Sequence, residues 1–255
     1  MKLKYSAQWL KKKFGFTLAE GATHVDLSQI KAKCGFTLAE VLITLGIIGV
    51  VAAITIPSLI TQNRARVLRS QYLKSYSMIY QMVRLMENDD VSLDTSVLGK
   101  IPNYLKGTTY CGGAGATLYD PKGDTLCFRK SNGEYKSYDG KTTVLASYMD
   151  DAQYVLPDGT LFLFEWDTLH YNDESHCWIH VDINGVKNGP NRFGVDVFTF
   201  QFTDGKLLAM GDEGTVYSDL GKYCNLKVSN SLNGLACAHY AKADADWFKK
   251  AVKLK

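Results

Sequence analysis

The chain has 255 residues, of which 46% are apolar and 22% are charged, and its formal net charge is +3. This length allows one large domain or two small ones, and the apolar content is sufficient for a buried core. The charge is distributed unevenly, because residues 1–35 carry a net +5 and the rest of the chain carries −2. The near-neutral body has no basic stripe, so we expect no nucleic acid among its partners.

A short sequence phrase occurs twice near the N-terminus. The first copy lies inside the basic leader, residues 1–35, and the second extends past its end. KKKFGFTLAE occupies residues 11–20 and KAKCGFTLAE occupies residues 31–40. A polar segment follows the first copy, whereas an apolar run follows the second. A basic leader before an apolar run predicts that the leader stays in the cytoplasm and that the near-neutral body is exported.

The apolar run, residues 36–62, contains a single charged residue, Glu40. A helix of this length and composition can cross a hydrocarbon core of about 30 Å, so we expect a transmembrane helix. A carboxylate in such a helix is costly and needs a partner. Pro57 predicts a kink in the helix. A plain uncleaved anchor is the main alternative, and a core helix of a soluble protein is the weaker one.

Residues 63–90 predict an amphipathic continuation of the same helix. Its apolar positions recur with a 3.6-residue period and predict one face that packs on the body. They are Leu68, Tyr72, Tyr76, Ile79, Val83 and Met86. Asn88-Asp89-Asp90 ends the pattern, which gives a helix of about fifty residues from Phe36.

Residues 91–255 predict an exported globular domain. Residues 108–116, TTYCGGAGA, are too rich in glycine for regular structure. Alternating or apolar runs at 155–156, 161–164, 176–183 and 195–202 predict an antiparallel sheet of three to five strands laid on the long helix. The tail, residues 240–255, predicts a short helix that docks through Trp247 and Phe248. The fold class is therefore α+β.

Five cysteines follow the leader, and this odd number leaves at least one without an intramolecular partner. Cys111 and Cys127 enclose a loop with a turn signal and predict a disulfide, with two unrelated thiols as the alternative. Cys177 falls on the apolar face of the 176–183 strand and predicts a buried free thiol.

Three histidines, His170, His176 and His180, lie close to Cys177 in the sequence. Their spacing matches no common zinc site, so we expect them to be exposed on a sheet face. The sequence contains no recognised catalytic constellation, and we expect a protein that is not an enzyme.

Lys33-Cys34-Gly35-Phe36-Thr37-Leu38-Ala39-Glu40, followed by VLITLGIIGVVAAITIPSLI, resembles the N-terminal signal of type IV prepilins and type II secretion pseudopilins. The resemblance covers residues 31–60. It implies that prepilin peptidase cleaves between Gly35 and Phe36 on the cytoplasmic side and then methylates the new amino group of Phe36. Two features depart from the pattern: the leader is long and contains the motif twice, and Cys34 takes a place often held by a basic or small residue.

The same resemblance implies a pilin-like fold and a structural role. The subunit would sit in the inner membrane with a single span and assemble with other pilin or pseudopilin subunits into a filament in the periplasm or at the cell surface. The Glu40 carboxylate would pair with the Phe36 amino group of a neighbouring subunit, because burying the two charges together avoids burying either alone. A Cys224–Cys237 disulfide would close a C-terminal loop, as in many pilins.

The loop at residues 182–196 resembles calcium-binding loops of major pseudopilins. Asp182, Asn184 and Asp196 would supply oxygen ligands. We favour the alternative of a structural loop in which Asp182 and Asp196 cap the backbone by hydrogen bonds, with no cofactor.

Two other functions remain open for an anchored protein of this kind. One is a monomeric adhesin or ligand-binding protein, for which Glu40 would be dispensable. The other is a competence pilin for DNA uptake, which would need a basic surface patch that the charge of −2 does not favour.

Overall fold

The computed structural model describes residues 35–91, 99–113, 127, 135–167, 176–203 and 205–254. Most of the leader, including the first copy of the repeated phrase, lies outside these residues, as do His170 and most of the loop between Cys111 and Cys127. The chain divides into two compact units, residues 1–50 and 51–255. The described part of the first unit consists of residues 35–37 and the start of helix α1 (Leu38–Asn88), and the large apolar side chains of this part are exposed.

Helix α1 confirms the predicted long helix and its predicted end. It contains 51 residues and continues through Pro57. At its C-terminus, Asp90 adopts a left-handed conformation with φ +53°. The amides of Asp90 and Val91 then donate to the carbonyls of Glu87 and Met86. This is a Schellman motif with an aspartate in the position that usually holds glycine.

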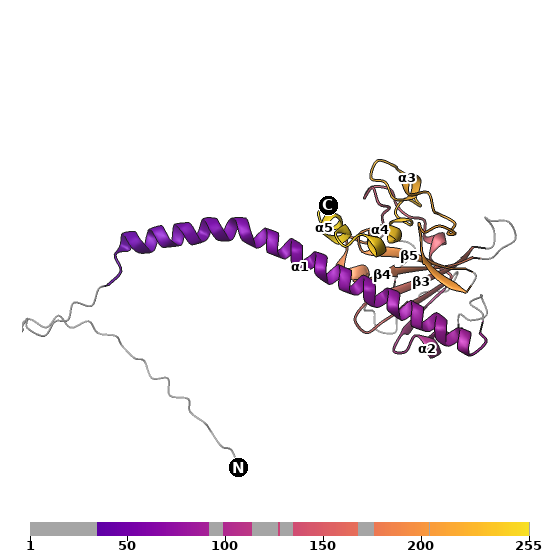
Figure 1. Cartoon of the computed structure of the whole chain (residues 1–255). Helices are drawn as coiled ribbons and strands as arrows, with labels where there is room; N and C mark the ends of the chain where they lie inside the picture. The colour runs from indigo at the N-terminus through magenta and orange to yellow at the C-terminus, as the bar shows by residue number, and fades with distance from the viewer. Residues whose placement is uncertain are drawn as a thin grey trace, which may run out of the picture. The chain divides into compact units, whose positions relative to one another are not determined.

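The second unit contains a six-stranded antiparallel sheet in which the strands follow one another in sequence order. Strands β3, β4 and β5 of this sheet are labelled in Figure 1. The strands are β1 (Thr109–Gly112), β2 (Ala152–Val155), β3 (Leu161–Asp167), β4 (His176–Asp182), β5 (Val197–Thr203) and β6 (Lys206–Ala209). The prediction of three to five strands is wrong by one. The four predicted runs correspond to β2 to β5, and the two outer strands were not predicted.

Strand β1 corrects the prediction of irregular structure at residues 108–116. Thr109–Gly112 is extended because it pairs with β2 along the edge of the sheet, and the register shifts between Tyr110 and Gly112. Beyond the bulge, Gly113 approaches the backbone of Asp151 so closely that a Cβ would lie 2.0 Å from the Asp151 carbonyl oxygen. The glycines here permit a close backbone approach rather than prevent a strand.

Both faces of the sheet are buried, and each belongs to its own apolar cluster. One face carries Phe162, Phe164, Ile179, Phe198 and Phe200 and packs against α1. The buried face of α1 matches the predicted stripe: Leu68, Tyr72, Ile79, Val83 and Met86 are buried and Tyr76 is partly buried. Side chains of the opposite face, including Leu161 and Trp178, are covered by loop residues such as Tyr135, Met149 and Met210.

Short helices complete the second unit: α2 (Ile101–Tyr104), the 3-10 turns Ala146–Tyr148 and Val186–Asn188, α3 (Leu220–Tyr223), α4 (Cys237–Ala243) and α5 (Trp247–Ala251). The single C-terminal helix that we predicted is therefore two helices, separated at residues 244–246. Trp247 and Phe248 are buried as predicted, and α4 and α5 belong to the same apolar cluster as α1.

Candidate functional site

The junction between Gly35 and Phe36 lies in a short non-helical segment directly before α1. The Phe36 side chain is 88% exposed. No heavy atom lies within 4 Å of the position that a Cβ on Gly35 would take. The described residues therefore leave the Gly35–Phe36 peptide bond, where cleavage is predicted, accessible to solvent.

Glu40 belongs to a capping box at the start of α1. The Thr37 hydroxyl accepts from the amide of Glu40 (3.2 Å), and the Glu40 carboxylate accepts from the amide and hydroxyl of Thr37 (both 2.8 Å). Such a reciprocal pair satisfies amides that the first turn of a helix leaves free. Thr37 was missed in the sequence, although the spacing Thr-x-x-Glu before an apolar run is a recognised signal for it.

Helix α1 is the one helix in the described residues that is long and apolar enough to cross a membrane. The 18-residue apolar segment of this helix that could span the membrane is not buried within the protein. Leu42, Ile47, Ile54 and Leu59 are among its exposed side chains. Exposed apolar side chains all around a helix are expected where lipid or neighbouring helices cover them.

The loop after β4 is organised by two buried carboxylates, as the favoured interpretation predicts. Asp182 accepts from the amides of Asn184 (3.3 Å) and Gly185 (2.7 Å) and from the Tyr135 hydroxyl (2.8 Å). Asp196 accepts from the amides of Asn191 (3.0 Å) and Arg192 (2.7 Å). The backbone capping is therefore confirmed.

The same loop brings together buried side-chain oxygen atoms, and two of them have no hydrogen-bond donor. Burial raises the pKa of both Asp182 and Asp196, and the proximity of Asp196 raises that of Asp182 further. The side-chain oxygens of Asn184 and Asn191 are buried without a hydrogen-bond partner. A cation could satisfy such a set of oxygens, since carboxylates and amide carbonyls are calcium ligands.

A second carboxylate group, Asp150, Asp151 and Glu165, was not predicted. One oxygen from each lies within 4.8 Å of the others. Asp151 and Glu165 come next to Ala152 and Phe164, which pair across β2 and β3. Two of these carboxylates accept backbone amides: Glu165 from Asp150 (3.3 Å) and Asp151 from Trp166 (2.7 Å). This group lies at the end of the β2–β3 hairpin away from its turn.

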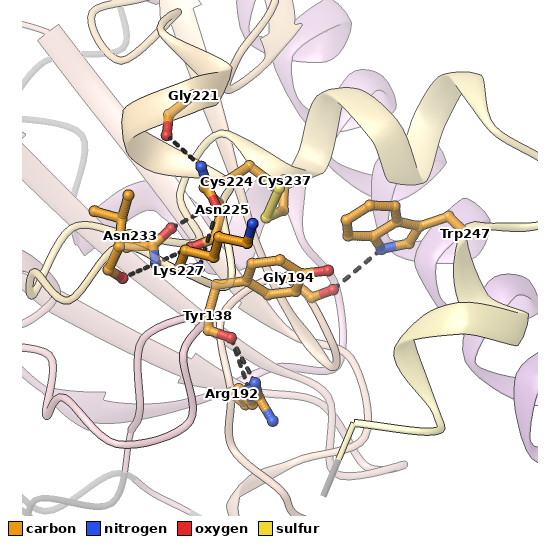
Figure 2. Close-up of a disulfide and its surroundings, with 11 residues drawn as sticks. Tyr138, Arg192, Gly194, Gly221, Cys224, Asn225, Lys227, Asn233, Cys237 and Trp247 are labelled. Atoms are coloured by element: carbon orange, nitrogen blue, oxygen red, sulfur yellow. Dashed lines mark hydrogen bonds between the residues drawn. A yellow bond between two sulfur atoms is a disulfide. The ribbon is translucent and has the colours of Figure 1, made fainter.

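The disulfide between Cys224 and Cys237 is present and closes a compact C-terminal loop (Figure 2). Asn233 fastens the interior of this loop: its side chain accepts from the Asn225 amide (3.0 Å) and donates to the Asn225 carbonyl (2.8 Å). Trp247 donates from its indole nitrogen to the Gly194 carbonyl (3.1 Å), which lies beside the bridge. The bridge therefore lies beside the end of the 182–196 loop, and the Trp247 hydrogen bond joins the tail to that end.

The second predicted disulfide, Cys111–Cys127, is also present, and Cys177 is a buried free thiol as predicted. Burial raises the pKa of the Cys177 thiol well above its usual value, so this thiol is unreactive.

The expectation of exposed histidines is wrong for His180, which is 0% exposed. Its ring bonds to the Thr199 hydroxyl (2.9 Å) and to the Tyr148 carbonyl (2.7 Å), and burial lowers its pKa to about 4. The physical reason is that loops cover this face of the sheet. His180 is a satisfied core residue.

The described N-terminal features thus define a class: a capped helix, long and apolar enough to cross a membrane, that follows the predicted cleavage junction and continues into a globular domain. Comparison with protein families matches residues 30–56 to the prokaryotic N-terminal methylation motif. Those residues are the prepilin-type cleavage and methylation signal of type IV pilins and pseudopilins. Neither the curated proteins nor the solved structures give a match to the chain.

Proposed function

We propose that the chain is a structural subunit of a type IV pilus or a type II secretion pseudopilus. The observation that carries the proposal is the open Gly35–Phe36 junction directly before a capped helix that has no charge between Val41 and Asn63. Prepilin peptidase would cleave there and methylate Phe36. Residues 36–62 would hold the subunit in the inner membrane, with the globular domain on the exported side.

Assembly with other subunits would then proceed through the N-terminal half of α1. The large exposed apolar side chains of this half need partners in any aqueous filament. Glu40 is its only carboxylate. Before assembly, Thr37 donates to this carboxylate, which lowers the cost of holding the charge in an apolar environment. In the filament, the methylated amino group of Phe36 from a neighbour would provide the opposite charge.

The experiment that tests this proposal is mass spectrometry of the protein purified from cells with and without prepilin peptidase. With the peptidase, the N-terminus should be N-methylated Phe36. Without it, the leader should remain and no filament should contain the chain.

We also propose that the loop at residues 182–196 can bind calcium. Support comes from the buried oxygens of Asn184 and Asn191 and from the two carboxylates whose pKa values burial raises. Asp182, Asn184 and Asp196 would be ligands, and the ion would hold this loop closed beside α1, where Arg64 donates to the Gly189 carbonyl (3.1 Å).

Calcium should therefore raise stability most at neutral pH. A carboxyl group whose pKa is higher in the folded than in the unfolded chain stabilises the fold when protonated, and this contribution is lost as the pH rises through the folded value. In a chelator, these two carboxyl groups should make the free energy of unfolding fall as the pH rises from about 4 into the neutral range, and His180, whose pKa is lowered, should offset part of that fall below about pH 6.5. Millimolar Ca²⁺ should oppose that fall, and Mg²⁺ should do so less, because Mg²⁺ demands a stricter geometry.

Thermal unfolding of the mature chain in detergent measures this effect. Asp139→Asn is a matched control, because Asp139 caps a separate turn at Lys141 and Thr142. It should keep the response to Ca²⁺, whereas Asp196→Asn should lose it. Identical melting curves of the unmodified chain in Ca²⁺ and in chelator at neutral pH would show that the loop is purely structural.

A further inference from the structure

A groove of about 830 Å³ lies between α1 and the C-terminal helix α5. Ala65 and Phe248, both buried, are among its lining residues. One end is lined by Pro57 and Thr61, from the last turns of the uncharged part of α1. All of these residues belong to the second unit of the chain.

Four cationic side chains also line the groove: Arg66 and Arg69 follow Thr61 along α1, and Lys249 and Lys253 come from α5 and the residues after it. The groove has a single carboxylate, Asp246, and this one pairs with Lys249 at 2.7 Å. Within the described residues, neither arginine nor Lys253 forms an ion pair. The groove therefore has an excess of positive charge that an anion would relieve.

The position of the groove along α1 indicates where that anion comes from. Twenty residues of helix, Val41 to Ile60, span about 30 Å, the thickness of a hydrocarbon core. Arg66 follows Ile60 by about 9 Å along the helix, which places it at the outer edge of the lipid head groups, a layer about 5–8 Å deep on each side of the core. Pro57 and Thr61 then lie at the boundary with the acyl chains.

We propose that this groove binds an anionic phospholipid of the leaflet that faces the globular domain. The phosphate would lie among the cationic side chains, and an acyl chain would leave the groove past Pro57 and Thr61. The inference rests on the membrane anchoring in the proposed function. Its consequence is that the bound lipid seats the domain on the membrane, and that this lipid must leave when the subunit enters a filament.

Native mass spectrometry of the mature chain in detergent tests the proposal, with phosphatidylglycerol and phosphatidylcholine of the same acyl chains as probes. The unmodified chain should retain phosphatidylglycerol in preference to phosphatidylcholine. The double variant Arg66→Gln/Arg69→Gln should bind it about 30-fold more weakly at low salt, since each cation near a lipid surface contributes about fivefold. The matched control Lys100→Gln/Lys106→Gln loses the same charge at the ends of α2 and should bind as the unmodified chain does.

A second variant, Lys249→Gln/Lys253→Gln, changes the opposite wall without touching α1 and should weaken binding as well. Inorganic phosphate should not displace the lipid at equal concentration, because it lacks the acyl chain. Displacement at equal concentration would make the groove a site for free phosphate and would overturn the lipid assignment. Equal retention of the two lipids, or equal losses in the groove variant and its control, would also overturn it.

One further outcome would assign the groove to a second copy of the chain: Arg66→Gln/Arg69→Gln keeps lipid selectivity but dissociates oligomers in detergent. The proposed function is tested separately. A methylated Phe36 with no lipid selectivity would overturn only the lipid proposal, whereas an unprocessed N-terminus with normal selectivity would overturn only the filament proposal.

Discussion

Replacing Glu40 with alanine should abolish filaments while leaving cleavage at Gly35 and membrane insertion intact. In the filament, the variant would leave the Phe36 amino group buried without a counter-charge, and removal of one partner from a buried ion pair costs about 3–5 kcal/mol. Such a loss at every subunit contact should reduce assembly more than a hundredfold. Immunoblots of sheared filaments and of membrane fractions, together with the mass of the N-terminus, measure the three properties separately.

A second variant separates the charge of Glu40 from its role in the capping box. Glu40→Gln keeps a side chain that can accept from the amide of Thr37, because glutamine also serves in a capping box. It removes only the charge. We expect Glu40→Gln to fail in assembly as Glu40→Ala does. Normal filaments from Glu40→Gln would show that Glu40 acts by capping α1 and would contradict the ion pair between subunits.

Phe198→Ala should lower the free energy of unfolding of the globular domain by about 3–5 kcal/mol, the usual cost of removing a buried aromatic ring. Phe198 is fully buried on β5, with its ring centroid 4.8 Å from that of Tyr72 on α1 and 5.5 Å from that of Phe248 on α5. The ring therefore links the three elements that form the helix-covered side of the core. Urea unfolding of the mature chain in detergent, followed by circular dichroism, measures the loss.

Tyr72→Phe is the matched control at the same contact. It keeps the ring and removes only the hydroxyl, which donates to the Ala238 carbonyl at 3.1 Å. We expect a loss of about 1 kcal/mol. A Phe198→Ala loss no larger than that of Tyr72→Phe would contradict the packing of α1 over β5.

The long helix could be predicted because its signals are local. Absence of charge from Val41 to Asn63, the period of the stripe from Leu68 to Met86 and the polar run at Asn88 are all properties of neighbouring residues. The alternation in β4 was readable for the same reason: Cys177 and Ile179 lie in the cluster under α1, and Trp178 lies in the opposite one.

The covering of the second sheet face could not be predicted by the same means. Alternation assigns His180 and Trp178 to one face but does not say whether loops cover that face. The covering residues, such as Tyr135 and Met210, are distant in the sequence and belong to segments without periodicity. Only Trp178 indicated in the sequence that this face is buried, because tryptophan side chains are mostly buried in folded proteins.

Within the candidate site, Glu40 was found because a lone charge stands out in an apolar run, whereas its partner Thr37 was not. The carboxylate group around Asp151 and Glu165 depends on strand register, which alternation alone leaves undetermined. The orphaned oxygens of Asn184 and Asn191 depend in the same way on the path of the loop between β4 and β5.

The most direct test of a processed filament subunit is the mass of the N-terminal peptide of the protein isolated from cells that contain prepilin peptidase. We predict a chain that begins at Phe36 and carries a methyl group on its amino nitrogen. A chain that retains Met1, or one that begins at Phe16 after the first copy of the repeated phrase, would contradict the account.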